Sequence, residues 1–194
     1  MAGPNGAGKT TLVEKGIIQA IAGHDLVTLN ADVRTRELLA ADPLMPDANL
    51  QAAIETDGRV AACIEQGVDV LVETVFSSDK YLDDIERART LGYQVGMIYV
   101  GLASSRDSIR RVALRQARGG HDVPPDKVVS RWFRSIAMLG RMADKLDRLF
   151  VFDNTRPEGP RLIALGVGRR VTLLEAGRIP EIDGVLRPTG QEEP

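Results

Sequence analysis

The 194-residue sequence has few of the residues that cross-link small proteins or bind metals. Its one cysteine, Cys63, excludes an internal disulfide and a cysteine-based metal site, and its apolar neighbours predict a small core residue in a reducing cytoplasm. The two histidines, His24 and His121, do not make a zinc site, and His24 is expected in a surface loop.

Long apolar runs and a strong charge imbalance are also missing. No stretch approaches the ~18 consecutive apolar residues of a membrane span, and a glycine-rich start stands where a signal peptide needs an apolar run. A formal net charge of -2 gives no general reason to expect nucleic acid. With 43% hydrophobic residues, the chain is predicted to form one soluble, cytoplasmic domain over 1–194, with neither a membrane nor a nucleic-acid partner.

Apolar runs of strand length alternate with segments of helical period, which is typical of an α/β domain with a parallel sheet. Strands are expected at 25–30, 68–74, 93–100 and 148–154, and helices near 9–22, 48–66, 79–91, 105–118 and 126–147. After Asn154 the pattern loosens. Residues 155–186 are predicted to form a C-terminal extension with a β-ribbon turning at 166–168, and 187–194 a disordered tail.

The opening stretch GPNGAGKTT holds two glycines, a lysine and a threonine at the spacing of a phosphate-binding P-loop. Its backbone N–H groups would surround the β-phosphate of ATP, Lys9 would supply a mobile charge, and the Thr10 hydroxyl would ligate Mg²⁺. The predicted cofactors are therefore ATP and Mg²⁺. The cofactor-binding residues expected in the loop are Asn5, Gly6, Ala7, Gly8, Lys9, Thr10 and Thr11.

Two acidic residues follow expected strands, where ligands of open α/β sheets bind. Asp32 is placed near the γ-phosphate, where a carboxylate can take the proton of an acceptor hydroxyl; the alternative is an N-cap of a helix starting near Val33. Glu73 would hold a metal-bound water or bind the acceptor, and contact with the acceptor is favoured, with an indirect influence on Mg²⁺. Simple turn chemistry, shared with Thr74, is its alternative.

A stripe of arginines lies on the helix expected over 105–118. Arg111, Arg115 and Arg118 share one face, which is ordinarily only solvated. The next segment, GGHDVPPDK, contains His121 and is predicted to be a lid over ATP because of its two glycines and its proline pair. We expect Arg115 first, then Arg118 and Arg131, to neutralise charge on the transferring phosphoryl group.

The motifs LNAD, ETVFSS, GY, RVALRQARGGHDVP and FDN, in this order, resemble those of the zeta-toxin-like branch of small P-loop kinases. The resemblance implies a three-layer P-loop NTPase sandwich and an ATP-dependent phosphotransferase acting on a sugar hydroxyl, with UDP-N-acetylglucosamine as the family's acceptor. It also implies an antitoxin as a candidate protein partner. Asp32 matches the family's catalytic aspartate, and with the loop and the arginines the predicted catalytic residues are Asp32, Lys9, Arg115, Arg118 and Arg131. Asn154 joins the cofactor-binding set, and the substrate-binding residues are Asn30, Asp32, Arg59, Glu73 and Thr74.

P-loops also serve two other functions. The loop also resembles that of ABC-transporter ATPase subunits, but an LSGGQ-type signature and an apolar run ending in Asp-Glu are missing. A nucleotide-binding module or partner-driven ATPase without its own acceptor stays open as the alternative to a kinase.

The strand that normally enters a P-loop is missing, since only Met1 and Ala2 precede Gly3. In P-loop kinases this strand is central in the order 2-3-1-4-5, so its loss would leave two unpaired edges. Three explanations stay open. The true start lies upstream, or the C-terminal ribbon or a second copy fills the gap, or the protein is a remnant that binds nucleotide poorly.

Overall fold

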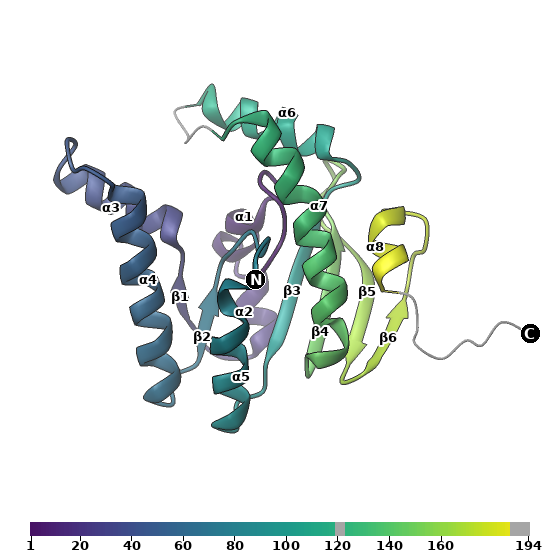
Figure 1. Cartoon of the computed structure of the whole chain (residues 1–194). Coiled ribbons are helices and arrows are strands. Elements are labelled where there is room, and N and C mark those ends of the chain that lie inside the picture. Colours follow the sequence, from purple (N-terminus) through teal and green to yellow (C-terminus); the bar gives the residue numbers. More distant parts are fainter. Residues whose placement is uncertain (119–122, 187–194) are drawn as a thin grey trace, which may run out of the picture.

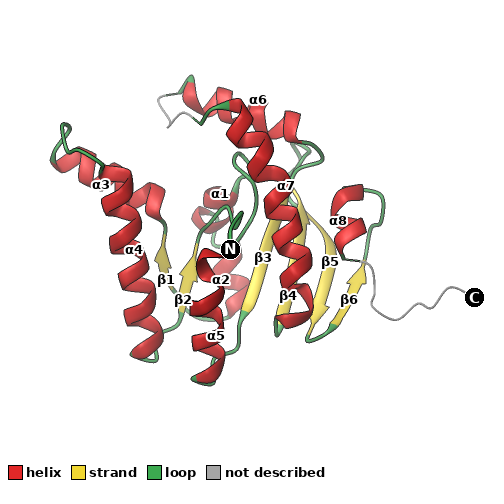
Figure 2. Cartoon of the chain, viewed as in Figure 1, coloured by secondary structure: helices red, strands yellow, loops and turns green. Residues whose placement is uncertain are grey.

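The computed structural model describes residues 1–118 and 123–186 and has an α/β fold (Figures 1 and 2). The strands are β1 (Val27–Leu29), β2 (Val70–Val72), β3 (Gly96–Gly101), β4 (Arg148–Asp153), β5 (Arg161–Val167) and β6 (Arg170–Leu173). The α-helices are α1 (Lys9–Glu14), α2 (Ile17–Ala22), α3 (Ala31–Ala41), α4 (Ala48–Glu65), α5 (Leu82–Thr90), α6 (Ser105–Gln116), α7 (Pro125–Met142) and α8 (Pro180–Val185). Two 3-10 turns, η1 (Asp79–Tyr81) and η2 (Ala143–Lys145), precede α5 and follow α7.

The strands form two hydrogen-bonded groups, and β1 to β4 alternate with helices along the chain, as expected. β1 pairs with β2 in parallel, and β3 pairs with β4 in parallel. β5 and β6 extend the second group as an antiparallel ribbon, so the order is β3-β4-β5-β6. The ribbon lies beyond β4, at the far edge from β2 (Figure 1), and the hypothesis that it fills the gap left by the missing strand is therefore wrong.

Met1 and Ala2 bridge the two strand groups. The Met1 amine donates to the Val72 carbonyl at 2.6 Å, and the Thr74 N–H donates to the Met1 carbonyl at 3.0 Å. On the other side, the Ala2 N–H donates to Ile98 O at 2.8 Å and the Ala2 carbonyl accepts from Val100 N at 2.9 Å. Two residues thus make the hydrogen bonds that connect β2 to β3, just before the P-loop.

Helices cover both faces of the sheet, as a buried parallel strand requires. Alternate side chains of β3 point to opposite faces: Met97 and Tyr99 join the core beneath α7, whereas Ile98 and Val100 join the core beneath α1 and α2. Figure 1 shows α4, α5 and α7 in front of the strands and α1 behind them. Within residues 1–118 and 123–186, no helix is both long and apolar enough to cross a membrane.

Local boundaries differ from the expected ones in two places. The helix predicted over 9–22 is divided at Gly16, whose φ of 69° is the left-handed conformation that favours glycine. The N-cap of α3 is Asn30, whose side chain accepts hydrogen bonds from the Asp32 and Val33 backbones, so the N-cap interpretation of Asp32 is wrong. The predicted lid residues 119–122, with His121, and the predicted tail 187–194 lie outside the described residues.

Candidate active site

The glycines of the P-loop are packed against two other parts of the chain. Gly6 and Gly8 have φ values of 75° and 88°. A Cβ atom added to Gly6 would lie 3.0 Å from Arg111 Cβ on α6, and one added to Gly8 would lie 2.5 Å from Asn154 Nδ2, just after β4. The loop therefore lies between α6 and the end of β4, and a side chain at either glycine would meet a close neighbour and a strained backbone.

Asn154 also binds the loop directly. Its Nδ2 donates to the Ala7 carbonyl at 2.8 Å, and its own N–H donates to the Gly101 carbonyl at 3.0 Å. The side chain thus ties the loop to the ends of β3 and β4. Of the other residues predicted to bind the cofactor, Asn5 is buried, with its Oδ1 unbonded among the described residues, and Thr11 is exposed at the start of α1.

Lys9 is the buried charge of the loop. It is 8% exposed, and its Nζ donates to the carbonyls of Gly3 at 2.8 Å and Pro4 at 3.1 Å. Burial lowers the pKa of Lys9 to about 8, while the carboxylates of Glu73 and Asp32 act to raise this pKa and Arg115 acts to lower it.

The groups that act on the pKa of Lys9 also show which predicted site residues the fold places near it. Asp32, Glu73 and Arg115 come from α3, the end of β2 and α6, and all three act electrostatically on Lys9. The P-loop lysine, the predicted proton acceptor and the first predicted arginine therefore share one region.

Glu73 holds the predicted Mg²⁺ ligand. The Thr10 hydroxyl donates to Glu73 Oε1 at 2.8 Å, and Asn30 Nδ2 donates to Glu73 Oε2 at 2.8 Å. Because Thr10 donates its proton to the carboxylate, its oxygen lone pairs are left to accept a cation. Hydroxyl and carboxylate oxygens suit Mg²⁺, which usually takes few protein ligands together with phosphate oxygens and water. In the described part of the chain, no group of three or more His, Cys, Asp and Glu could hold a metal.

Asp32 lies in the first turn of α3 with an exposed side chain. Its backbone N–H donates to Asn30 Oδ1 at 2.8 Å, which fixes the start of the helix that carries it. Within 1–118 and 123–186, no hydrogen bond engages its carboxylate. That carboxylate can therefore accept a proton from a bound hydroxyl.

A cavity of about 340 Å³ opens beside Thr10, between the ends of β1 and β2 and helices α1, α3 and α4. Of the residues predicted to bind substrate, Asn30, Arg59 and Glu73 line it, whereas Asp32 and Thr74 do not. The full lining is Thr10, Val13, Glu14, Thr28, Leu29, Asn30, Val33, Arg34, Arg36, Glu37, Glu55, Thr56, Arg59 and Glu73.

Thr74 takes part in the turn after β2 instead. Its Oγ1 accepts from the Phe76 backbone N–H at 3.0 Å, and Phe76 has a left-handed φ of 52°. The buried Ser135 of α7 donates to the Val75 carbonyl at 2.8 Å and so anchors the same turn. This turn fixes the chain directly after Glu73.

Sequence reasoning missed two ion-pair clusters near the site. Arg34 lines the cavity and binds Glu37 at 3.0 Å and Glu55 at 2.6 Å. Arg178, in the C-terminal extension, lies 3.3 Å from the buried carboxylate of Asp153 at the end of β4. The spacing of Arg34 and Glu37 was visible as a helical pair, but the other two contacts join distant segments and leave no local signal.

The predicted arginines take different positions. Arg115 is exposed on α6 and close enough to Lys9 to act on its pKa. Arg111, from the same stripe, donates to the Thr155 carbonyl at 2.9 Å and ties α6 to the segment after β4. Arg118 is exposed after α6 and Arg131 is half-buried on α7, and neither side chain makes an ion pair or hydrogen bond with the described residues.

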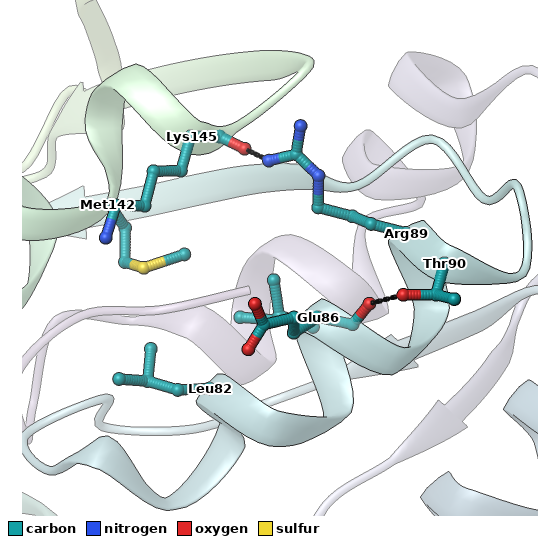
Figure 3. A pocket seen from close by; sticks show the side chains of 7 residues that line it. Leu82, Glu86, Arg89, Thr90, Met142 and Lys145 are labelled. Carbon is teal, nitrogen blue, oxygen red and sulfur yellow. Dashed lines mark hydrogen bonds between the residues drawn. The ribbon is translucent and has the colours of Figure 1, made fainter.

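A larger hollow of about 490 Å³ lies at the opposite end of the molecule, between α5 and the end of α7. Figure 3 shows the side chains that line it, which are both apolar and charged, with Arg89 donating to the Lys145 carbonyl. No predicted site residue lines it. We place the candidate active site at the smaller cavity, because Thr10 and Glu73 line that one.

The P-loop, the parallel strands and the acidic residue after β2 define a P-loop kinase-like fold. The sequence matches the zeta toxin family over residues 1–157, and the chain belongs to this family. Family and fold together support a P-loop kinase-type function.

The chain is also similar to individual proteins of known sequence or structure. An uncharacterized protein of Haemophilus influenzae is 23% identical over 132 residues, which are 67% of this chain and 88% of the relative. A crystal structure of AvrRxo1-ORF1 with AvrRxo1-ORF2 is similar with a TM-score of 0.65 and 19% identity, over 100% of this chain and 65% of that one; another crystal structure of that complex is with ATP. The PezAT toxin-antitoxin structure from Streptococcus pneumoniae gives a TM-score of 0.57 and 18% identity, over 85% of this chain and 71% of that one. The chain therefore spans slightly less than two thirds of the AvrRxo1-ORF1 structure.

Proposed function

We propose that this protein is an ATP-dependent kinase that transfers the γ-phosphoryl group to a hydroxyl of a small molecule, a nucleotide sugar such as UDP-N-acetylglucosamine. One observation carries the proposal. The carboxylates of Asp32 and Glu73 both act on the charge of the P-loop lysine, Glu73 binds Thr10, and Thr10 and Glu73 line a cavity of about 340 Å³. A nucleotide-binding module without an acceptor needs neither the cavity nor the carboxylate.

In the proposed reaction, the oxygen of the acceptor hydroxyl attacks the γ-phosphorus while Asp32 takes the hydroxyl proton. The bond between the γ-phosphorus and the oxygen that bridges it to the β-phosphate breaks, and its electrons leave with ADP. Lys9 and Arg115 stabilise the charge on the transferring group. Mg²⁺, held by Thr10 with support from Glu73, would neutralise charge on the β and γ phosphate oxygens when bound.

Four acidic side chains and three arginines line the cavity, and the pairing among them leaves a guanidinium for an anionic acceptor. Glu37 and Glu55 are both paired with Arg34, and Glu73 accepts two hydrogen bonds. Arg59 lines the same cavity and, among the described residues, has no acidic partner within ion-pair distance. An unpaired guanidinium suits a phosphate, so the diphosphate of a nucleotide sugar would complement it.

We also propose an antitoxin as a protein partner, because the family is that of the zeta toxins and one similar structure is of a toxin-antitoxin system. Co-expression with the product of an adjacent gene, followed by affinity purification, tests this partner. Recovery of a stoichiometric complex is expected, and recovery of the chain alone would count against it.

The kinase function is tested by incubating the purified protein with ATP, Mg²⁺ and single nucleotide sugars, with the products identified by mass spectrometry. We expect one acceptor to gain one phosphate while ADP forms in equal amount. ADP formation that no acceptor accelerates would instead favour the partner-driven ATPase.

A further inference from the structure

Asn30 joins two parts of the candidate active site through one side-chain amide. It follows β1 directly, and Glu73 lies beside it across the parallel strand pair, where the Glu73 N–H donates to the Leu29 carbonyl at 2.9 Å. Asn30 Nδ2 donates to Glu73 Oε2 at 2.8 Å. Oδ1 of the same amide accepts from the backbones of Asp32 at 2.8 Å and Val33 at 3.4 Å. One planar group thus holds both a carboxylate and the first turn of α3.

The second oxygen of Glu73 continues this connection to the P-loop. Glu73 Oε1 accepts the Thr10 hydroxyl at 2.8 Å, so hydrogen bonds run without a break from Thr10 through Glu73 and Asn30 to the backbone of Asp32. The two ends of this series are the predicted cation ligand and the predicted proton acceptor. The distance between Thr10 and Asp32 decides whether the acceptor hydroxyl meets the γ-phosphate in line. Small errors in such placement lower the rate of transfer.

We propose that Asn30 is a positioning residue, which fixes Asp32 relative to Thr10 and Glu73, and that binding of the acceptor is not its role. The inference rests on the proposed kinase function. The amide suits this task because it donates at one end and accepts at the other. An ionised aspartate could cap α3 equally well but could not donate to Glu73, and a serine hydroxyl is too short to do both.

Three variants separate positioning from capping. Asn30→Asp and Asn30→Ser keep an N-cap acceptor and lose the bond to Glu73, whereas Asn30→Ala loses both. We expect all three to lower kcat by about 10-fold or more, the usual scale for removing an outer partner of a metal or catalytic group, with KM for the acceptor unchanged. Asn30→Ser keeps the cap without a new charge, so it should melt at a higher temperature than Asn30→Ala, whereas Asn30→Asp also places a second carboxylate beside Glu73.

Two results would overturn the proposal. A rise in KM at constant kcat in Asn30→Asp and Asn30→Ser would show that Asn30 binds the acceptor. A kcat that follows the melting temperature, with full activity in the two capped variants, would show that Asn30 is only a helix cap.

A measurement without acceptor separates this inference from the kinase proposal. Glu73→Gln loses the negative charge and replaces one of the two accepting oxygens with an NH2 group that cannot accept, so the bonds from Thr10 and Asn30 change and the ¹⁵N–¹H resonances of Asp32 and Val33 should shift. Glu65→Gln, at the far end of α4, is the control and should leave them in place. Absence of a shift in Glu73→Gln would overturn the linkage even in an active kinase. If the shift occurs but the wild-type chain phosphorylates no acceptor, the linkage stands and the kinase proposal fails.

Discussion

Replacing Gly6 by alanine tests whether α6 lies directly on the P-loop. The new Cβ would lie 3.0 Å from Arg111 Cβ and 3.1 Å from the Ser108 carbonyl oxygen, and neither atom can move without moving α6. The φ of 75° adds the cost of a left-handed alanine. We expect the left-handed backbone to cost about 1–2 kcal/mol and the overpacking about 1–3 kcal/mol more.

Gly16→Ala is the matched control for this variant. Gly16 has a similar φ of 69°, but an added Cβ would meet nothing within 4 Å. Gly16→Ala should therefore lose only the backbone part, about 1–2 kcal/mol of the free energy of unfolding. Urea unfolding can be followed by the fluorescence of Trp132, the single tryptophan, which is 2% exposed. Equal losses in the two variants would refute the packing of α6 on the loop.

Three other predictions address the charges around the site. Since the pKa of Lys9 is lowered to about 8, its charge in the free protein is lost as the pH rises through 8. ATP affinity measured by calorimetry should therefore weaken between pH 7 and pH 9, and a constant affinity would contradict this. Arg178→Met should lower the free energy of unfolding by up to about 3 kcal/mol, because it removes the guanidinium beside the buried carboxylate of Asp153, which keeps its hydrogen bonds from Thr155. The loss should be much smaller in an Asp153→Asn background, and the same loss in both would show that the pair contributes nothing. Arg115→Ala should slow phosphoryl transfer roughly 10²-fold, whereas Arg106→Ala, at an exposed position on the same helix, should not. Equal transfer rates in the two variants would show that Arg115 does not take part in the reaction.

The parts of the fold that local chemistry dictates were predictable from the sequence. The parallel strands and the P-loop follow from apolar periodicity and from glycines placed beside Lys9 and Thr10. The placement of Asp32 and Glu73 at neighbouring strand ends follows from sheet topology, because β1 and β2 end together. The roles assigned to these residues stay predictions.

Contacts between distant segments were not predictable in the same way. Asn30 caps α3 through its Oδ1 and binds Glu73 through its Nδ2, and no local pattern distinguishes it from Asp32 as the cap. The central position of Met1 and Ala2 could not be inferred, because two residues are too short to show a strand period. The ion pair joins Arg178, just before α8, to Asp153 at the end of β4, and a local sequence pattern does not encode contacts between such distant segments.

The most direct test of the central claim is a single-turnover measurement with Asp32→Asn, once an acceptor is found. The variant should bind ATP as tightly as the wild type and transfer the phosphoryl group at a rate lower by ~10² or more, since only the proton acceptor is lost. Lys9→Ala should weaken both ATP binding and transfer, because its charge acts before and during the reaction. Transfer by Asp32→Asn at the wild-type rate would contradict the proposed mechanism.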